Sequence, residues 1–306
     1  MNQIEYGAVF QRALDKTMIA DLCTGWMDQN ADRAKYEGGA QIKIPKLMLS
    51  GLGDYNRLTG YPEGTVTLEF ETRMMTQDRG RGFCLDAMDV EESGFVLAAG
   101  EVLGEFQKKH VVPEVDAYRI SQLSALSSGR NRTYTPEAKN LLKALRQDIA
   151  AVQDKIGERE ALVVMMSLPV ASLMDENDSI SRQLNVGDFS KGEASMKVKM
   201  IDEVPILRVP SGRMHTDFTF FDGVSAADGI MPDQTAGGFA QTPTAGKINW
   251  IVCARTAPIA VCKTDTVRIF DPASYQKAHA WRLDYRKYHD MWVSDNQLDG
   301  IFVNRA

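Results

Sequence analysis

The chain has 306 residues, of which 44% are hydrophobic and 25% are charged, a balance that predicts a folded globular protein of one large or two moderate domains. Its apolar runs are too short to cross a bilayer and its first six residues are polar, so we expect neither a membrane segment nor a secretory signal. A net charge of -6 gives no general electrostatic reason to coat nucleic acid.

An amphipathic helix is predicted over residues 6–27, where apolar side chains that include Phe10 and Leu14 recur at helical spacing. The polar segment that follows, residues 28–39, ends in two glycines and predicts a soft linker. A helix tethered in this way needs a surface to dock on, which either its own domain or a neighbouring chain could provide.

Two strands separated by a long glycine-rich segment, residues 50–64, predict an extended hairpin. Pro45 in the first strand marks a bulge or an unpaired edge. The apolar members of the two strands are Ile42, Ile44, Leu47, Leu49, Val66, Leu68 and Phe70. An isolated hairpin is only marginally stable in water, so this one needs a surface to lie on. Composition favours neither the chain's own core nor another subunit as that surface.

A turn-rich charged stretch is predicted at residues 76–89. It contains Arg79-Gly80-Arg81, whose arginines could contact phosphate or form structural ion pairs. A long helix is expected over residues 89–110, with Asp89 and Glu92 forming a capping box. Pro113 is expected to end this helix and to open the next one.

The second half of the chain predicts a compact mixed domain followed by strands. Residues 129–135 form a candidate domain boundary, and Thr135 begins a helix that continues to Ile156. A buried strand at 161–167, a short helix at 169–177 and a long surface loop at 222–246 are expected next. The other predicted strands lie at 198–209, as a pair, and at 248–254, 258–263, 267–270, 281–286 and 301–303.

Motifs for catalysis or metal binding do not emerge from the sequence. The cysteines and histidines are scattered, at Cys23, Cys84, Cys253, Cys262, His110, His215, His279 and His289. Their spacing contains no CxxC, HExxH or HxH, and the glycine spacing predicts no phosphate-binding loop. We therefore predict reduced core thiols and no catalytic residue, cofactor or metal site. A Cys/His pair that folding brings together stays open.

Six short stretches between residues 36 and 130 share a recognisable pattern. They are Ile42-Lys43-Ile44-Pro45-Lys46, Ser50-Gly51-Leu52-Gly53-Asp54-Tyr55, Phe70-Glu71-Thr72, Thr76-Gln77-Asp78-Arg79-Gly80-Arg81, Asp86-Ala87-Met88-Asp89-Val90 and Val112-Pro113-Glu114-Val115-Asp116-Ala117-Tyr118. These stretches resemble the major capsid proteins of tailed bacteriophages, which have the Hong Kong 97-like fold. Residues 131–306 are similar only in the order of their predicted elements. The resemblance implies an α+β fold.

The resemblance also implies named parts. Residues 1–35 would be the N-arm and 36–76 the extended E-loop hairpin. Residues 77–134 with 255–306 would form the P-domain, whose long spine helix is the one expected at 89–110. Residues 135–254 would form the A-domain.

The function implied by the resemblance is structural. Hexamers and pentamers of the chain would assemble in the host cytoplasm into the icosahedral head of a virion, around double-stranded DNA that the shell contacts without sequence preference. Further partners would be a separate scaffolding protein, a portal and possible decoration proteins, with no membrane. Subunit contacts are expected at Phe10, Leu14, Ile42, Ile44, Leu47, Tyr55, Tyr61, Val66, Leu68, Phe70, Arg79 and Arg81.

Two alternatives remain at this point. An encapsulin-type bacterial compartment would keep the fold and enclose enzymes instead of a genome. An enzyme of unknown class would use a Cys/His pair in a pocket and would be a self-contained particle. The state of assembly of the purified chain separates the shell hypotheses from the enzyme.

Overall fold

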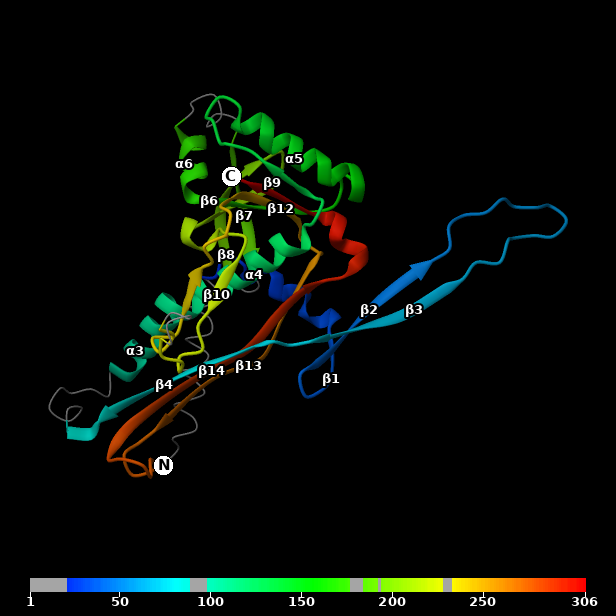
Figure 1. The fold of residues 1–306 in the computed structure, drawn as a ribbon. Helices are drawn as coiled ribbons and strands as arrows, with labels where there is room; N and C mark the ends of the chain where they lie inside the picture. Colours follow the sequence, from blue (N-terminus) through cyan, green and yellow to red (C-terminus); the bar gives the residue numbers. More distant parts are fainter. Residues whose placement is uncertain (1–20, 89–97, 177–183, 192–193, 228–232) are drawn as a thin grey trace.

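The computed structural model describes residues 21–88, 98–176, 184–191, 194–227 and 233–306. Figure 1 shows a body built on a mixed sheet, a long three-stranded sheet beside it and a hairpin that extends away from both. The predicted α+β class is confirmed. The N-terminal positions of the helix expected at 6–27, with Phe10 and Leu14, lie outside the described residues.

The body is organised around a seven-stranded sheet in the order β5-β15-β12-β6-β9-β8-β7. The pairs β6–β9 and β5–β15 are parallel, and the other neighbours are antiparallel. The strands are β5 (Asn131–Thr133), β6 (Leu162–Ser167), β7 (Asn185–Lys191), β8 (Ala194–Ile201), β9 (Val204–Val209), β12 (Ile248–Ala254) and β15 (Ile301–Arg305). Every residue of β6 and β12 is buried, as their continuous apolar runs predict.

Two helices, α5 (Leu141–Ile156) and α6 (Leu168–Asp175), pack on this sheet. The buried positions of α5 follow the helical period, with Leu141, Leu145 and Val152 in the main core. The helix begins at Leu141, six residues after the predicted start at Thr135. Residues 134–140 form an irregular connection between β5, which pairs with β15, and α5.

Three long antiparallel strands form the second sheet, in the order β13-β14-β4, with bounds Pro258–Phe270 for β13, Ala280–Val293 for β14 and Gln77–Asp86 for β4. The prediction of turns over 76–89 was wrong, because β4 pairs with β14 along its whole length. The strands expected at 258–263 and 267–270 are one strand with an irregularity between Cys262 and Thr264. Charged and glycine residues are typical of turns, so the sequence pattern did not predict β4, which is an edge strand of this sheet.

Gly80 of β4 is required by the close approach of β14, and its neighbour Gly82 is not. A Cβ on Gly80 would lie 2.9 Å from the backbone oxygen of Tyr285, whereas one on Gly82 would meet the movable guanidinium of Arg282. We expect Gly80→Ala to lower the free energy of unfolding by about 1–3 kcal/mol, the usual cost of overpacking. Gly82→Ala should cost less than about 1 kcal/mol in the same urea titration. Equal losses in the two variants would contradict this packing.

The expected spine helix is present from residue 98 onward, as α3 (Ala98–Phe106), and its proposed capping box lies outside the described residues. It does not end at Pro113. A π-helical turn (Gln107–Val111) leads directly into α4 (Val112–Leu126), with Pro113 in the first turn of α4. Proline has no N–H to donate to the preceding turn, and a wider turn accommodates that loss without breaking the helix.

The soft linker predicted over 28–39 is instead ordered. Residues Gly25–Arg33 form a 3₁₀ helix, η1, and β1 (Lys35–Gly38) follows it. Trp26 and Met27 are fully buried in the main core, and Asn30 donates hydrogen bonds to the carbonyls of Arg255 and Pro258. The polar composition of this segment predicted a linker. The prediction failed because the partners that order these polar groups lie far away in the sequence and leave no local signal.

The expected hairpin is confirmed. β2 (Gln41–Leu49) and β3 (Val66–Met74) pair without a bulge along nine residues, and β1 adds a short third strand at the base. The pairing of β1 stops at Lys43, so Pro45 stands where β2 has an unpaired edge. β3 runs almost directly into β4 (Figure 1), so the hairpin is joined to the second sheet by a continuous extended chain.

The predicted division into domains cuts through the seven-stranded sheet. β5 and β15 fall in the segments assigned to the P-domain, yet both belong to the sheet that contains β6 and β12 of the expected A-domain. The final strand forms backbone hydrogen bonds with β12, so the boundaries at 134 and 254 do not follow the sheets. The excursion between β9 and β12 carries η4 (Ser211–Arg213) and two short strands, β10 (Phe218–Phe220) and β11 (Phe239–Gln241).

Candidate subunit interface

Exposed apolar side chains gather on the hairpin. Eighteen large hydrophobic side chains are exposed in the described part of the chain, and twelve of them lie between residues 36 and 74. Single exposed hydrophobic residues are ordinary on any protein surface, but a contiguous group indicates a binding surface. The hairpin extends into solvent (Figure 1), so most of this group is far from the body of the chain.

The strand register places these side chains in one row. Leu47 is opposite Leu68, Leu49 is opposite Val66, and Pro45 is opposite Phe70. Residues that face each other across an antiparallel pair project from the same side of the sheet. We call these six residues the apolar row: Pro45, Leu47, Leu49, Val66, Leu68 and Phe70. Its strand-centre members Leu47 and Leu68 are 52% and 57% exposed.

Ile42 and Ile44 are not part of the apolar row, which corrects their prediction as subunit contacts. Both are fully buried in the chain's own interior, in a cluster with Ile259 and Val261 of β13. Successive side chains on a strand alternate between faces, so the even positions 42 and 44 point opposite to the odd positions 47 and 49. The apolar residues change face at Pro45. At the base of the hairpin they face the chain's own interior, and in the outer part they lie on the opposite, exposed face.

Charged side chains tie the inward face at the base. Lys46 and Arg73 both reach Asp295, which follows β14, at 3.3 Å and 3.4 Å, and Glu71 pairs with both cations. These pairs are partly exposed, so each adds little stability. Together with Ile42 and Ile44 they fix the direction in which the hairpin leaves the body.

The tip of the hairpin carries further exposed apolar groups. Tyr55 and Tyr61 pack against each other with ring centroids 5.0 Å apart, while both remain largely exposed. Asn56 and Gly60 close the turn with two backbone hydrogen bonds, and Gly60 has the left-handed φ that favours glycine. Leu58, within this turn, is almost completely exposed. The tip is thus a small folded turn with an apolar surface.

A buried carboxylate holds the joint between the hairpin and the second sheet. Asp290 accepts hydrogen bonds from the Tyr118 hydroxyl at 2.5 Å and from the Thr76 backbone N–H at 2.8 Å. Burial and this hydrogen bond to Asp290 raise the pKa of Tyr118, so the phenol remains a donor. Thr76 lies between β3 and β4, and its attachment fixes the point where the hairpin ends and the second sheet begins.

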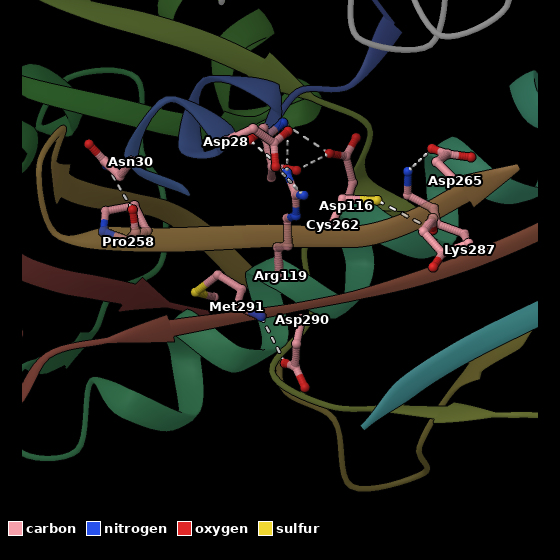
Figure 2. A network of polar contacts seen from close by, with 12 residues as sticks. Asp28, Asn30, Asp116, Arg119, Pro258, Cys262, Asp265, Lys287, Asp290 and Met291 are labelled. Carbon is pink, nitrogen blue, oxygen red and sulfur yellow. Dashed lines mark hydrogen bonds and ion pairs between the residues drawn. The ribbon is translucent and has the colours of Figure 1, made fainter. Parts of the chain in front are cut away.

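A buried arginine fixes the segment that precedes the hairpin on the other side. Figure 2 shows Arg119 of α4 directed at Asp28 of η1, with N···O distances of 2.6 Å and 3.2 Å. Arg119 also donates to the carbonyl of Thr24 at 3.1 Å. Asp116, three residues before Arg119 on α4, accepts hydrogen bonds from the Thr24 hydroxyl and from the Arg213 guanidinium. Residues 23–28 are therefore held by charge-assisted hydrogen bonds on the body.

Arg79 and Arg81 have partners within the chain. Arg79 forms an ion pair with Glu114 at 2.6 Å and donates to the carbonyl of Gly238, and Arg81 donates to the carbonyl of Thr235. The geometry matches the structural ion pair that the sequence left open for Arg79. Both arginines line a pocket of about 340 Å³ that also contacts His110 and His289.

The chemistry of this region does not activate a nucleophile. Cys262 and His289, one of the Cys/His pairs that the sequence left open, are opposite each other in the β13–β14 register. Desolvation of the thiol raises the pKa of Cys262, although the residue as a whole is exposed, and burial lowers the pKa of His289. A reactive cysteine needs the opposite shift of the thiol. Among the described residues, no three His, Cys, Asp or Glu side chains gather as a metal site would require.

The expected subunit contacts omitted three exposed residues of the hairpin and its tip: Leu49, which was named only as an apolar member of the first strand, Leu52 and Leu58. Leu49 could have been found because, like Leu47, it is at an odd position of the strand, and Leu52 and Leu58 could have been found from their place in the expected glycine-rich turn. In the described part of the chain, no helix has the length and apolar character needed to cross a membrane.

Comparisons with known proteins support a fold and not a close relative. No family model and no curated protein matches the chain. Among solved structures, the capsid of cyanophage P-SCSP1u has a TM-score of 0.58 at 12% identity, over 89% of this chain and 85% of that one. The mature capsid of bacteriophage PhiM1 has 0.54 at 16% identity, over 88% and 82%. The capsid of Ralstonia phage GP4 has 0.53 at 9% identity, over 88% and 84%.

These similarities extend over most of both chains, and with the hairpin, the spine helix and the mixed sheet they define the class of fold. The chain has the Hong Kong 97-like fold of tailed-phage major capsid proteins. The expectation drawn from the six short sequence stretches is confirmed at the level of the fold.

Proposed function

We propose that this chain is a shell subunit, the major capsid protein of a tailed bacteriophage. The observation that carries the proposal is the apolar row, which extends from the body on a hairpin and is left exposed by the described residues of the chain. Covering such a row with another protein removes apolar area from water. A second copy of the chain is always present at equal concentration and repeats the same contact around a closed shell.

The hairpin geometry supports a contact between copies better than a contact within one copy. Ile42 and Ile44 already use the inward face, and Asp290 and Asp295 hold both ends of the hairpin base. Folding the row back on the body would require those attachments to break. We propose that the apolar row and the tip residues Tyr55 and Tyr61 lie on a neighbouring subunit.

Assembly as hexamers and pentamers into an icosahedral head around double-stranded DNA is part of the same proposal, as are a virion location and assembly in the host cytoplasm. The fold similarity to phage capsids supports it. Separate scaffolding, portal and decoration proteins would complete the particle. Each subunit contact is modest, and repetition of the contact over the shell makes the whole particle stable.

Sedimentation velocity followed by negative-stain electron microscopy tests the proposal on the purified chain, alone and with its co-expressed neighbouring gene products. We expect capsomers, tubes or closed shells. Shells that carry a cargo enzyme and no DNA would favour an encapsulin-type compartment. A monodisperse monomer at all concentrations, with and without these gene products, would contradict a shell function.

A further inference from the structure

Arg79 and Arg81 lie on the same face of β4, two residues apart, at the end of a row that continues with Phe83 and Leu85. Phe83 packs against Phe106 of the spine helix, with ring centroids 5.0 Å apart. The two arginines therefore lie on the edge strand of the second sheet, next to the place where this sheet packs on the spine helix. Their position brings them to the excursion between β9 and β12 of the seven-stranded sheet.

The described flanks of the connection between β10 and β11, residues 221–227 and 233–238, are tied to each other. The Phe221 N–H donates to the carbonyl of Gly238 at 2.9 Å, and the Gln234 N–H donates to the carbonyl of Ser225 at 2.9 Å. The Asp222 N–H donates to the Gln234 side-chain oxygen at 3.2 Å. We call these flanks the loop base. The loop base can move only as one piece unless these bonds break.

Both arginines bind the loop base through its carbonyl oxygens. Arg79 donates to Gly238 at 3.2 Å while its other side faces Glu114, and Arg81 donates to Thr235 at 3.3 Å. A Cβ on Gly223 would lie 3.0 Å from the Arg81 guanidinium, and one on Gly237 would lie 3.4 Å from it. The Arg81 guanidinium thus lies between two glycines, one on each flank, and a side chain at Gly223 would crowd it.

We infer that Arg79 and Arg81 act as a two-point clamp that fixes the loop base to β4 and so links the second sheet to the excursion between β9 and β12. β4 continues into the hairpin strand β3 with only two residues between them. The clamp therefore sets the position of the loop base relative to the hairpin strand. Arginine suits this role because its planar fork donates in several directions and keeps its charge at every physiological pH. The inference holds for the single chain and does not depend on assembly.

Hydrogen exchange of the unassembled chain, followed by mass spectrometry on peptides covering the loop base, tests the clamp. We expect Arg81→Gln to speed exchange there by about tenfold, as the loss of one charge-assisted hydrogen bond predicts. Arg79→Lys should have a similar effect, because lysine keeps a charge for Glu114 but cannot reach Gly238 at the same time. Arg268→Gln, at an exposed position of β13, is the control and should leave the loop base unchanged.

Two glycine variants separate the clamp from simple backbone strain. Gly223 and Gly238 both have left-handed φ values, so alanine strains the backbone at either position, but only a Cβ at Gly223 approaches Arg81. Gly223→Ala should speed exchange more than Gly238→Ala, and the excess should disappear in the Arg81→Gln background. Unchanged exchange in both arginine variants, or strictly additive effects of Gly223→Ala and Arg81→Gln, would overturn the clamp.

Discussion

Replacing Leu68 with aspartate should weaken shell assembly strongly while leaving the single chain folded. Leu68 is 57% exposed and faces Leu47 in the middle of the apolar row, so the free chain loses few contacts. In the assembled state the change removes about 1.5–3 kcal/mol of apolar burial and places a charge in an apolar contact. Since each 1.4 kcal/mol is a factor of ten, we expect the concentration needed for assembly to rise at least about tenfold.

Thr67→Asp provides the matched control. Thr67 is the adjacent residue on the same strand, and it points to the opposite face, across from Met48. The substitution adds the same charge to the same hairpin, so any general effect of charge on the strand appears in both variants. Assembly is measured by light scattering against protein concentration, with circular dichroism as the check on folding. Equal assembly of the two variants would mean that the apolar row is not a contact.

Replacing Arg119 with methionine should cause the largest loss of stability. Its side chain is 1% exposed and holds Asp28 and the carbonyl of Thr24. Methionine fills much of the same volume but leaves these acceptors without their donor. Asp28 is 36% exposed, so water hydrates it once Arg119 is gone, and the loss stays below the full cost of breaking a completely buried pair, at about 2–3 kcal/mol. That is a large part of the stability of a typical folded domain.

The exposed pair of Arg146 with Asp202 is the control for this variant. Its side chains are 45% and 59% exposed, so Arg146→Met should change the free energy of unfolding by less than about 1 kcal/mol. Urea titrations followed by tryptophan fluorescence compare the two, and Trp26 of η1 reports directly on the segment that Arg119 holds. A loss below about 1 kcal/mol for Arg119→Met would show that the buried pair does not anchor η1.

The parts of the fold that sequence predicted best are those with one dominant pattern. The continuous apolar runs of β6 and β12 and the helical period of α5 each led to the correct element. The hairpin was also predicted, because Val66, Leu68 and Phe70 alternate with polar residues. For β6, β12 and α5 the local pattern and the tertiary environment agree, whereas the alternation in β3 marks an apolar face that the described chain leaves exposed.

The errors have a different physical origin, in contacts between distant segments. The charged, glycine-containing β4 is a strand because β14 pairs with it along its whole length, and no local pattern announces that partner. The polar residues of η1 are ordered because Arg119 donates hydrogen bonds to Asp28, and Asn30 donates one to the carbonyl of Pro258. Tertiary hydrogen bonds overrode composition in both places.

The candidate interface was predicted in part for the same reason. Counting apolar residues found the hairpin, but only strand parity shows that Ile44 and Leu47 point to opposite faces. The carbonyl partners of Arg79 and Arg81 lie more than 150 residues away, and Glu114 lies 35 residues from Arg79. Sequence could therefore name these arginines but could not choose between phosphate and protein as their ligand.

Cryo-electron microscopy of the assembled particle tests the central claim most directly, because it shows what covers the hairpin. The account predicts that β2 and β3 of every subunit lie across another copy, with Leu47, Leu68 and Phe70 buried in that contact. A map in which the hairpin folds against its own body, or in which these three side chains face solvent in an intact shell, would contradict it.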